Sequence, residues 1–217
     1  MAGSMRALLF LIAAAYAQDP YRVAGDHYHL QFENAWVRAT RVTYGPHEQA
    51  PVHNHPPTPT TVYVYVSNGG VMRFHHVTGE HVAGFTFDRR AVKAGGIRFA
   101  HGAPETHSVE YLGDLPTEYV RIELRTDPKD RPTRDVRLPP ATMDASKTGA
   151  ETQFENGQIR IVRVMCAAGE KCPAAALPYV DVVMSGERRG EARWSPPPAE
   201  GPLELVRIEL KTPPIQP

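Results

Sequence analysis

The stretch FENAWVRATRV at residues 32–42 returns as FENGQIRIVRV at residues 154–164. A second stretch, EYVRIELRT at residues 118–126, returns as ELVRIELKT at residues 204–212. Two matches in the same order, at the two ends of each unit, indicate that one structural unit has been duplicated. The second copy is much shorter between its matches, so we expect it to be incomplete and to rely on the first copy for part of its core.

Short runs rich in Val, Tyr, Phe and Thr fill the first copy from Tyr28 to Thr126, and Gly, Pro and Asn separate them. Such runs are typical of β-strands. No strongly periodic helix lies among them, so an all-β antiparallel barrel or sandwich is expected. The clearer predicted strands cover residues 36–44, 62–66, 71–76, 82–87, 96–101, 106–112 and 118–125.

The first 17 residues predict export. Met1 to Ser4 look like a vector-derived remnant, Arg6 precedes an apolar run, and Ala15-Tyr16-Ala17 forms a small-x-small cleavage site. We therefore expect a bacterial-type signal peptide and a secreted or periplasmic protein. A frayed apolar N-terminus or a short membrane anchor is the alternative. The predicted parts are the remnant and signal peptide (1–17), a metal-binding barrel (18–126), a charged, proline-containing linker (127–150) and a degenerate second repeat (151–217).

The charge balance argues against some classes of partner. Lys and Arg number 24, as do Asp and Glu, so the formal net charge is zero. There is no whole-chain attraction to nucleic acid or to an anionic membrane. We expect a small-molecule ligand or substrate, no nucleic acid, and no stable membrane span once the signal peptide is removed. The sequence has no Walker loop, GxSxG elbow or dinucleotide fingerprint, which argues against nucleotide use and serine hydrolysis.

All ten histidines lie in the first copy. His53-Asn54-His55 is an HxH pair, and residues two apart on an extended strand project from the same face. Two imidazoles can then hold one cation. Carried over by the offset of the first match, His53 and His55 correspond to Ala175 and Leu177 in the second copy. A role in packing alone therefore does not require imidazole at these places.

Two segments around these histidines resemble the motifs of the cupin superfamily, G-(x)5-HxH-(x)3,4-E-(x)6-G and G-(x)5-PxG-(x)2-H-(x)3-N. The first segment, GPHEQAPVHNHPPTP, begins at Gly45, and the second, GIRFAHGAPETH, runs from Gly96 to His107. Gly45, His53, His55 and Gly69 fit the first motif with a longer gap, and Gly96 and His107 fit the second more loosely. The resemblance covers most of residues 28–126 and, through the internal repeat, weakly residues 152–212.

The resemblance implies a cupin-type antiparallel β-barrel, or jelly roll, followed by a second, shortened β repeat in a bicupin-like arrangement. It also implies that His53, His55 and His107 hold one divalent metal. Where the family has a glutamate ligand, this chain reads Thr58-Pro59-Thr60-Thr61-Val62, without a carboxylate. We therefore expect three neutral histidines plus open positions. Such a site suits Zn, Fe, Mn, Ni or Cu, and the sequence does not choose among them.

Other residues are weaker candidates. His101 and Glu110 are considered as a fourth ligand or as a partner of a ligand, although strand alternation with His107 inward points Glu110 outward. Cys166 and Cys172 can pair in an oxidising compartment, with two buried thiols as the alternative. The candidates for pocket lining, with packing as the alternative, are Tyr63, Tyr65, Arg73, Arg98 and Phe99. Surface or core roles are expected for His27, His29, His47, His75, His76 and His81.

Three functions remain open. The first is a metalloenzyme acting on a small organic molecule, because three-histidine cupin sites resemble those of certain dioxygenases, so a metal-dependent oxidoreductase is a candidate. The alternative is a binding or sensing protein of the cell envelope that holds a small molecule without turnover. In the third, the metal only stabilises the fold. The resemblance to cupins also makes a homodimer a candidate assembly.

Overall fold

The structure, a computed structural model, describes residues 18–78, 82–102, 104–130 and 135–215. The predicted remnant and signal peptide, and also His81, lie outside these residues. The described part contains three antiparallel sheets and one short helix, α2 (Pro20–Val23). No helix in these ranges is long and apolar enough to cross a membrane. The prediction of an all-β fold built from antiparallel sheets is confirmed.

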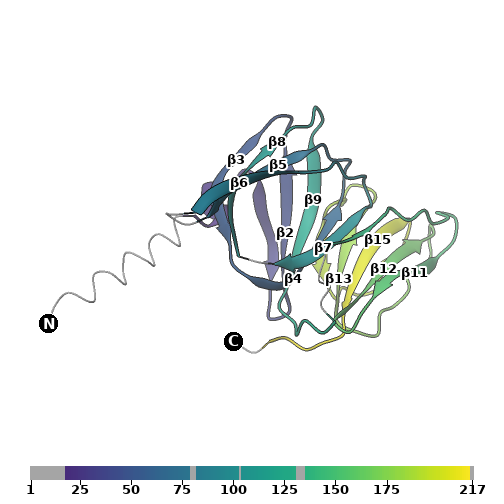
Figure 1. Ribbon diagram of the computed structural model, residues 1–217. Coiled ribbons are helices and arrows are strands. Elements are labelled where there is room, and N and C mark those ends of the chain that lie inside the picture. The colour runs from purple at the N-terminus through teal and green to yellow at the C-terminus, as the bar shows by residue number, and fades with distance from the viewer. Residues whose placement is uncertain (1–17, 79–81, 103, 131–134, 216–217) are drawn as a thin grey trace.

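The strands form sheets of six, four and five members, and Figure 1 shows the five-stranded sheet on one side of the molecule. The six-stranded sheet has the order β1 (Tyr28–Glu33), β2 (Val37–Tyr44), β9 (Thr117–Leu124), β4 (Thr58–Tyr65), β7 (Ile97–Gly102) and β10 (Val136–Leu138). The four-stranded sheet has the order β3 (Gln49–His55), β8 (Glu105–Tyr111), β5 (Met72–Thr78) and β6 (Val82–Arg89). The five-stranded sheet has the order β11 (Gly149–Glu155), β12 (Ile159–Cys166), β15 (Leu203–Leu210), β13 (Tyr179–Val183) and β14 (Ala192–Trp194).

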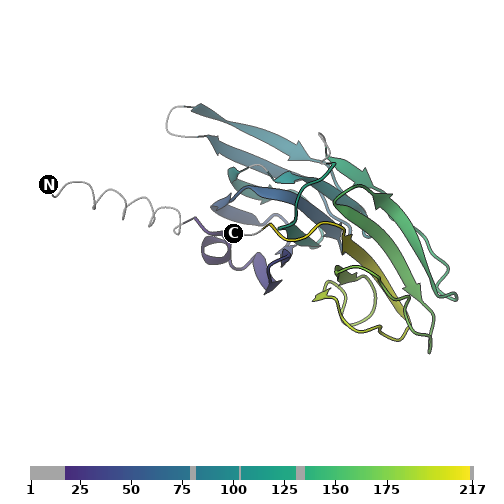
Figure 2. The same ribbon diagram turned by 90° about the horizontal axis from the view of Figure 1, so that it is seen from below.

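Two apolar cores hold these sheets in three layers. One core joins the four-stranded sheet to one face of the six-stranded sheet, with Phe74 and Val109 packed near Val42 and Tyr119. The other core joins the opposite face of the six-stranded sheet to the five-stranded sheet (Figure 2). The second repeat therefore packs against the back of the first barrel, as its short length predicts.

Strand β9 lies at the centre of this arrangement and is buried on both faces. Val120, Ile122 and Leu124 belong to the core shared with the second repeat. On the other face, Tyr119 packs in the barrel interior, and Arg121 is also buried. Strand alternation places Arg121 on the same face as Tyr119. A strand covered on both sides thus carries a charged side chain into the barrel.

The predicted linker is partly built into the first barrel. Val136 to Leu138 form β10, which pairs antiparallel with β7. The second repeat begins at Gly149, where β11 pairs with β12. The short strand in the linker has no long apolar run, so its pairing follows from the free edge of β7 and not from a strong local preference.

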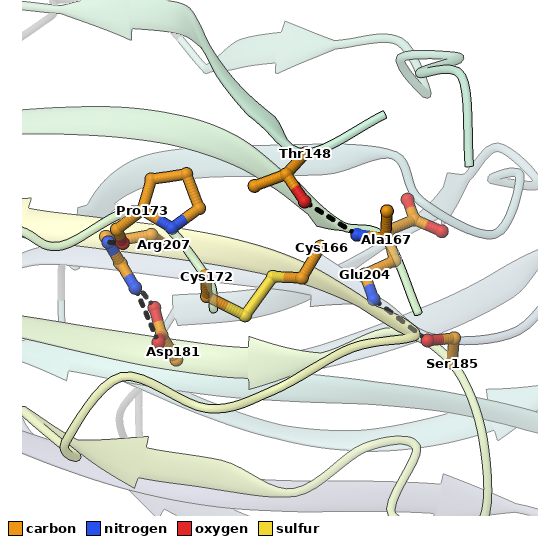
Figure 3. The surroundings of a disulfide bond; sticks show 9 residues. All are labelled: Thr148, Cys166, Ala167, Cys172, Pro173, Asp181, Ser185, Glu204 and Arg207. Carbon is orange, nitrogen blue, oxygen red and sulfur yellow. Dashed lines mark hydrogen bonds and ion pairs between the residues drawn. A yellow bond between two sulfur atoms is a disulfide. The ribbon is translucent and has the colours of Figure 1, made fainter. Parts of the chain in front are cut away.

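Cys166 and Cys172 form a disulfide that closes a loop with a sequence separation of 6 (Figure 3). A crosslink over so short a loop stabilises the folded chain by about 2 kcal/mol. We expect the double variant Cys166→Ala, Cys172→Ala to lose this amount of unfolding free energy in urea titrations. Reduction should weaken the native chain equally and leave the variant unchanged, and a native chain insensitive to reduction would contradict this.

Candidate metal centre

Neighbouring strands of the four-stranded sheet place histidines in one row. His53 on β3 lies directly opposite His107 on β8, and His107 lies opposite His76 on β5. His55 follows two residues after His53 and shares its buried face. The row explains how two histidines from one sequence segment meet a third from some fifty residues later.

A β-bulge turns the HxH pair into the barrel. The register between β3 and β8 shifts between Ala50 and His53. Ala50, His53 and His55 are all buried, so the inward-facing residues change from even to odd numbers across the bulge. Without the extra residue, strict alternation would point both histidines outward.

The three histidines form one compact, buried group. The ring centroid of His53 lies 4.9 Å from that of His55 and 4.9 Å from that of His107, and the other two centroids are 5.3 Å apart. One ring nitrogen of each lies within 4.8 Å of those of the others. His76 is not in this group, although its ring lies 5.1 Å from that of His107.

Burial keeps these imidazoles neutral. It lowers the pKa of His53 to about 4, although a hydrogen bond to the Pro51 carbonyl opposes the shift. Burial lowers the pKa of His107 to about 2, helped by the neighbouring His53. The pKa of His55 falls well below its ordinary value because of burial and then because of the nearby Arg121 guanidinium. Neutral imidazoles are the form that binds a metal.

Hydrogen bonds fix the orientation of His53. Its Nδ1 lies 2.8 Å from the carbonyl oxygen of Pro51, which can only accept, so Nδ1 carries the proton. The lone pair is then on Nε2, 3.1 Å from the hydroxyl of Tyr28. The buried Nδ1 of His107 has no hydrogen-bond partner among the described residues, and the Glu105 carboxylate lies 3.6 Å from it.

Arg121 is the charged residue that the sequence reasoning missed. Its Nη1 donates to the ring of His55, 3.0 Å from Nε2 and closer still to Nδ1. Burial would lower the pKa of Arg121, but Tyr63, Glu123, Tyr28 and Tyr119 together raise it above its ordinary value. The alternation of Tyr119, Arg121 and Glu123 against three aliphatic residues is the signal that could have revealed it.

Two cavities adjoin the histidines. A cavity of about 620 Å³ is lined by His55, Arg121, Tyr28 and Glu123, among others. A void of about 10 Å³, also lined by His55, His107 and Arg121, lies beside it and shares several lining residues with it. The smaller void has the size of a single water molecule or ion. The larger can take a small organic molecule.

Most of the other predicted site residues lie away from the histidines. His101 is exposed, and Glu110 is near Arg73 and His75 on the outer surface. Arg73 itself pairs with Asp88 there. None of these groups lies in the cluster of three histidines.

The predicted pocket-lining residues divide between several places. Tyr63 lines the small void next to the histidines. Tyr65 packs in the barrel core, with its ring 5.7 Å from that of Tyr119. Arg98 pairs with Asp135 and lines a separate cavity of about 340 Å³. Phe99 faces the second repeat, because odd-numbered residues of β7 point to the shared core.

The residues present fit a divalent metal. The donors are three neutral imidazoles, and imidazole suits Zn, Fe, Mn, Ni and Cu. One of them has a buried nitrogen that no described residue contacts by a hydrogen bond. The residues that would hold the ion are His53, His55 and His107. Three protein ligands leave positions free for another group.

No protein-family model and no curated protein matches the sequence, whereas solved structures share its fold. AerE from Microcystis aeruginosa is 11% identical, with a TM-score of 0.51, over 85% of this chain and 99% of that one. YhaK from Escherichia coli is 12% identical, with a TM-score of 0.51, over 85% and 91%. A cupin 2 conserved barrel domain protein from Leptotrichia buccalis is 10% identical, with a TM-score of 0.46, over 83% and 86%. Identities this low show a likeness of fold alone.

Proposed function

We propose that the first barrel is a divalent metal centre of the cupin type that acts on a small organic molecule. The observation that carries this proposal is the group of three buried histidines whose nitrogens lie within 4.8 Å of one another. A metal held there would act as a Lewis acid on a carbonyl or carboxylate group. Dioxygenase-type oxidation is the first reaction class to test.

The surroundings of the histidines support a role in chemistry and not only in folding. His55 lines both the small void and the 620 Å³ cavity, so a molecule in the cavity can reach the centre. Tyr28 and Arg121 supply a hydroxyl and a guanidinium at the same place. These groups can orient a polar molecule, and Phe74 forms an apolar wall on one side, with its ring centroid 5.2 Å from that of His107.

Metal analysis followed by turnover assays tests the proposal. Protein purified without added metal should contain a transition metal in stoichiometric amount by mass spectrometry, and chelation should remove it. Reloading with Fe, Mn, Ni, Cu or Zn should restore product formation from a panel of diketones, phenolic acids and sugar acids in air. We expect activity with one of these ions and none in the metal-free protein.

The same assays separate the enzyme from an envelope binding or sensing protein. Saturable affinity for a compound of the panel, with no product under any metal, would favour the binding protein. Protein that neither retains nor takes up any of the five metals would contradict both forms of the proposal.

A further inference from the structure

The guanidinium of Arg121 has hydrogen-bonding capacity that the barrel leaves unused. Arg121 is 7% exposed. Its Nη1 donates to His55, and its Nη2 lies 3.1 Å from the Glu123 carboxylate. Its Nε is buried and has no partner among the described residues. A buried N–H without an acceptor costs free energy, so an acceptor supplied from outside would be bound favourably.

The second copy of the duplicated unit shows what such an arginine binds. Arg207 holds the position in ELVRIELKT that Arg121 holds in EYVRIELRT. Its Nε and Nη2 donate to the two carboxylate oxygens of Asp181 at 2.8 and 3.0 Å, and its Nη1 donates to the Pro173 carbonyl (Figure 3). The second copy thus contains a complete, two-pronged arginine–carboxylate pair.

The first copy has no carboxylate at the corresponding place. Asp181 lies directly opposite Arg207 across β13 and β15, and Tyr63 lies directly opposite Arg121 across β4 and β9. The first copy therefore has Tyr63 at the position where the second copy has Asp181. The Nε of Arg121 lacks the carboxylate that the Nε of Arg207 contacts.

Arg121 shares its carboxylate partner, Glu123, with Arg38. Arg38 and Arg121 line the 620 Å³ cavity together with three carboxylates, those of Asp19, Glu105 and Glu123. The unused Nε of Arg121, and not an excess of positive charge, is therefore what favours a carboxylate here.

Arg121 and a metal ion compete for His55. A guanidinium N–H can only donate, so its hydrogen bond uses the lone pair of His55, and a neutral imidazole has a single lone pair. A metal needs that same lone pair, and the positive charge of Arg121 also opposes a cation nearby. A group that draws Arg121 away from His55 would free this ligand.

We propose that Arg121 binds the carboxylate of a small organic acid through Nε and Nη2, the two nitrogens that Arg207 uses to bind Asp181, and that this carboxylate and the metal bind cooperatively. This inference rests on the proposed metal centre and names its substrate class. The carboxylate accepts from Nε and Nη2, neutralises the guanidinium and leaves the lone pair of His55 to the metal. Each ligand thereby strengthens the binding of the other.

Calorimetric titration of the metal-free full chain with Co²⁺ tests the coupling. Acetate is the probe, acetamide is its neutral control, and ionic strength is held constant. Coupling between sites commonly changes affinity by about 5- to 150-fold, so we expect acetate to tighten Co²⁺ binding about tenfold or more. Acetamide should have no effect. An equal affinity with acetate and with acetamide would overturn the inference while leaving the metal centre in place.

Two variants identify the residue responsible. Tyr63→Asp restores the carboxylate of the second copy, so it should tighten Co²⁺ binding without acetate and abolish the acetate response. Arg121→Gln removes the guanidinium that competes with the metal for His55 and that would bind acetate. Acetate should therefore no longer change the Co²⁺ affinity of this variant. Arg73→Gln, on the outer surface, should behave as the native chain. Full retention of the acetate response in Tyr63→Asp and Arg121→Gln would overturn the inference.

Acetate binding without metal keeps the two proposals separable. If the native chain binds no Co²⁺, the metal centre fails, and the metal-free protein is titrated with ¹³C-acetate by NMR. Binding that is lost in Arg121→Gln but kept in Arg73→Gln would then support the carboxylate site. Equal binding in both variants would exclude Arg121 as its residue. If Arg121→Gln does not fold, Arg121→Lys replaces it. This variant should lose most of the acetate response, because the single ammonium group of lysine cannot donate two parallel hydrogen bonds to one carboxylate.

Discussion

Replacing His53 or His107 with alanine should abolish stoichiometric binding of a divalent metal. Each substitution removes one of only three protein donors in a buried group that contains no carboxylate. Loss of a mere hydrogen-bond partner of a ligand costs about 10- to 100-fold in metal affinity, so loss of a ligand should cost more than about 100-fold. Calorimetry with Co²⁺ or Zn²⁺ measures the affinity, and elemental analysis measures the retained metal.

The control is a histidine from the same barrel that faces outward. His75 lies on β5, bonds to Thr86 and is near Glu110, so His75→Ala should retain full metal content. His53 is completely buried, and alanine would leave a hole there. His53→Gln keeps most of the volume and separates loss of a ligand from loss of the fold. Full metal content in the His53 and His107 variants would refute the centre.

Mild acid should destabilise the metal-free protein. His53 and His107 have folded-state pKa values of about 4 and about 2, because burial penalises the charged ring. In the unfolded chain both titrate near pH 6.5, so as pH falls below 6.5 the unfolded state takes up protons that the folded state does not. The stability that these two neutral histidines contribute is therefore fully present above pH 6.5, and it is lost as the pH falls toward their folded-state pKa values. At pH 5 the loss is about 2 kcal/mol for each of these two histidines.

Urea unfolding of the metal-free chain at pH 7.5 and pH 5.0 measures this effect. Other groups also titrate in this range, so the comparison is with His107→Gln, which has no proton to take up at that position. The variant should lose about 2 kcal/mol less than the native chain between the two pH values. Equal losses of unfolding free energy in the variant and the native chain would mean that His107 is readily protonated in the folded barrel. Burial also lowers the pKa of His55, so this residue adds to the loss in both proteins.

The strands were predictable because their residues alternate or form short β-rich runs. The predicted strand 118–125, for example, is β9 at Thr117–Leu124, and 36–44 is β2 at Val37–Tyr44. The incomplete second copy also followed from sequence, since its shorter spacing leaves too few strands for a barrel. Strand β10 did not, because Val136 to Leu138 pair with β7 only once the sheet edge exists.

The structure brings together the three histidines that the sequence singled out, but their charged neighbour was not predicted. The bulge after Ala50 that turns His53 inward has no sequence signal of its own. The absence of a carboxylate at Thr58 to Val62 was visible, whereas the guanidinium beside His55 comes from β9, 66 residues later. Pairing across such a distance depends on sheet register, and periodicity within one segment does not report it.

The second copy contributes no histidine to the group of three, yet it packs against the strand beside it. Ile208 and Val206 of β15 pack in the same core as Val120 and Ile122, the residues on either side of Arg121. The packing of the C-terminal layer therefore supports the backbone that positions the guanidinium. The second copy thus buttresses, through side-chain packing alone, the strand that carries Arg121 into the first barrel.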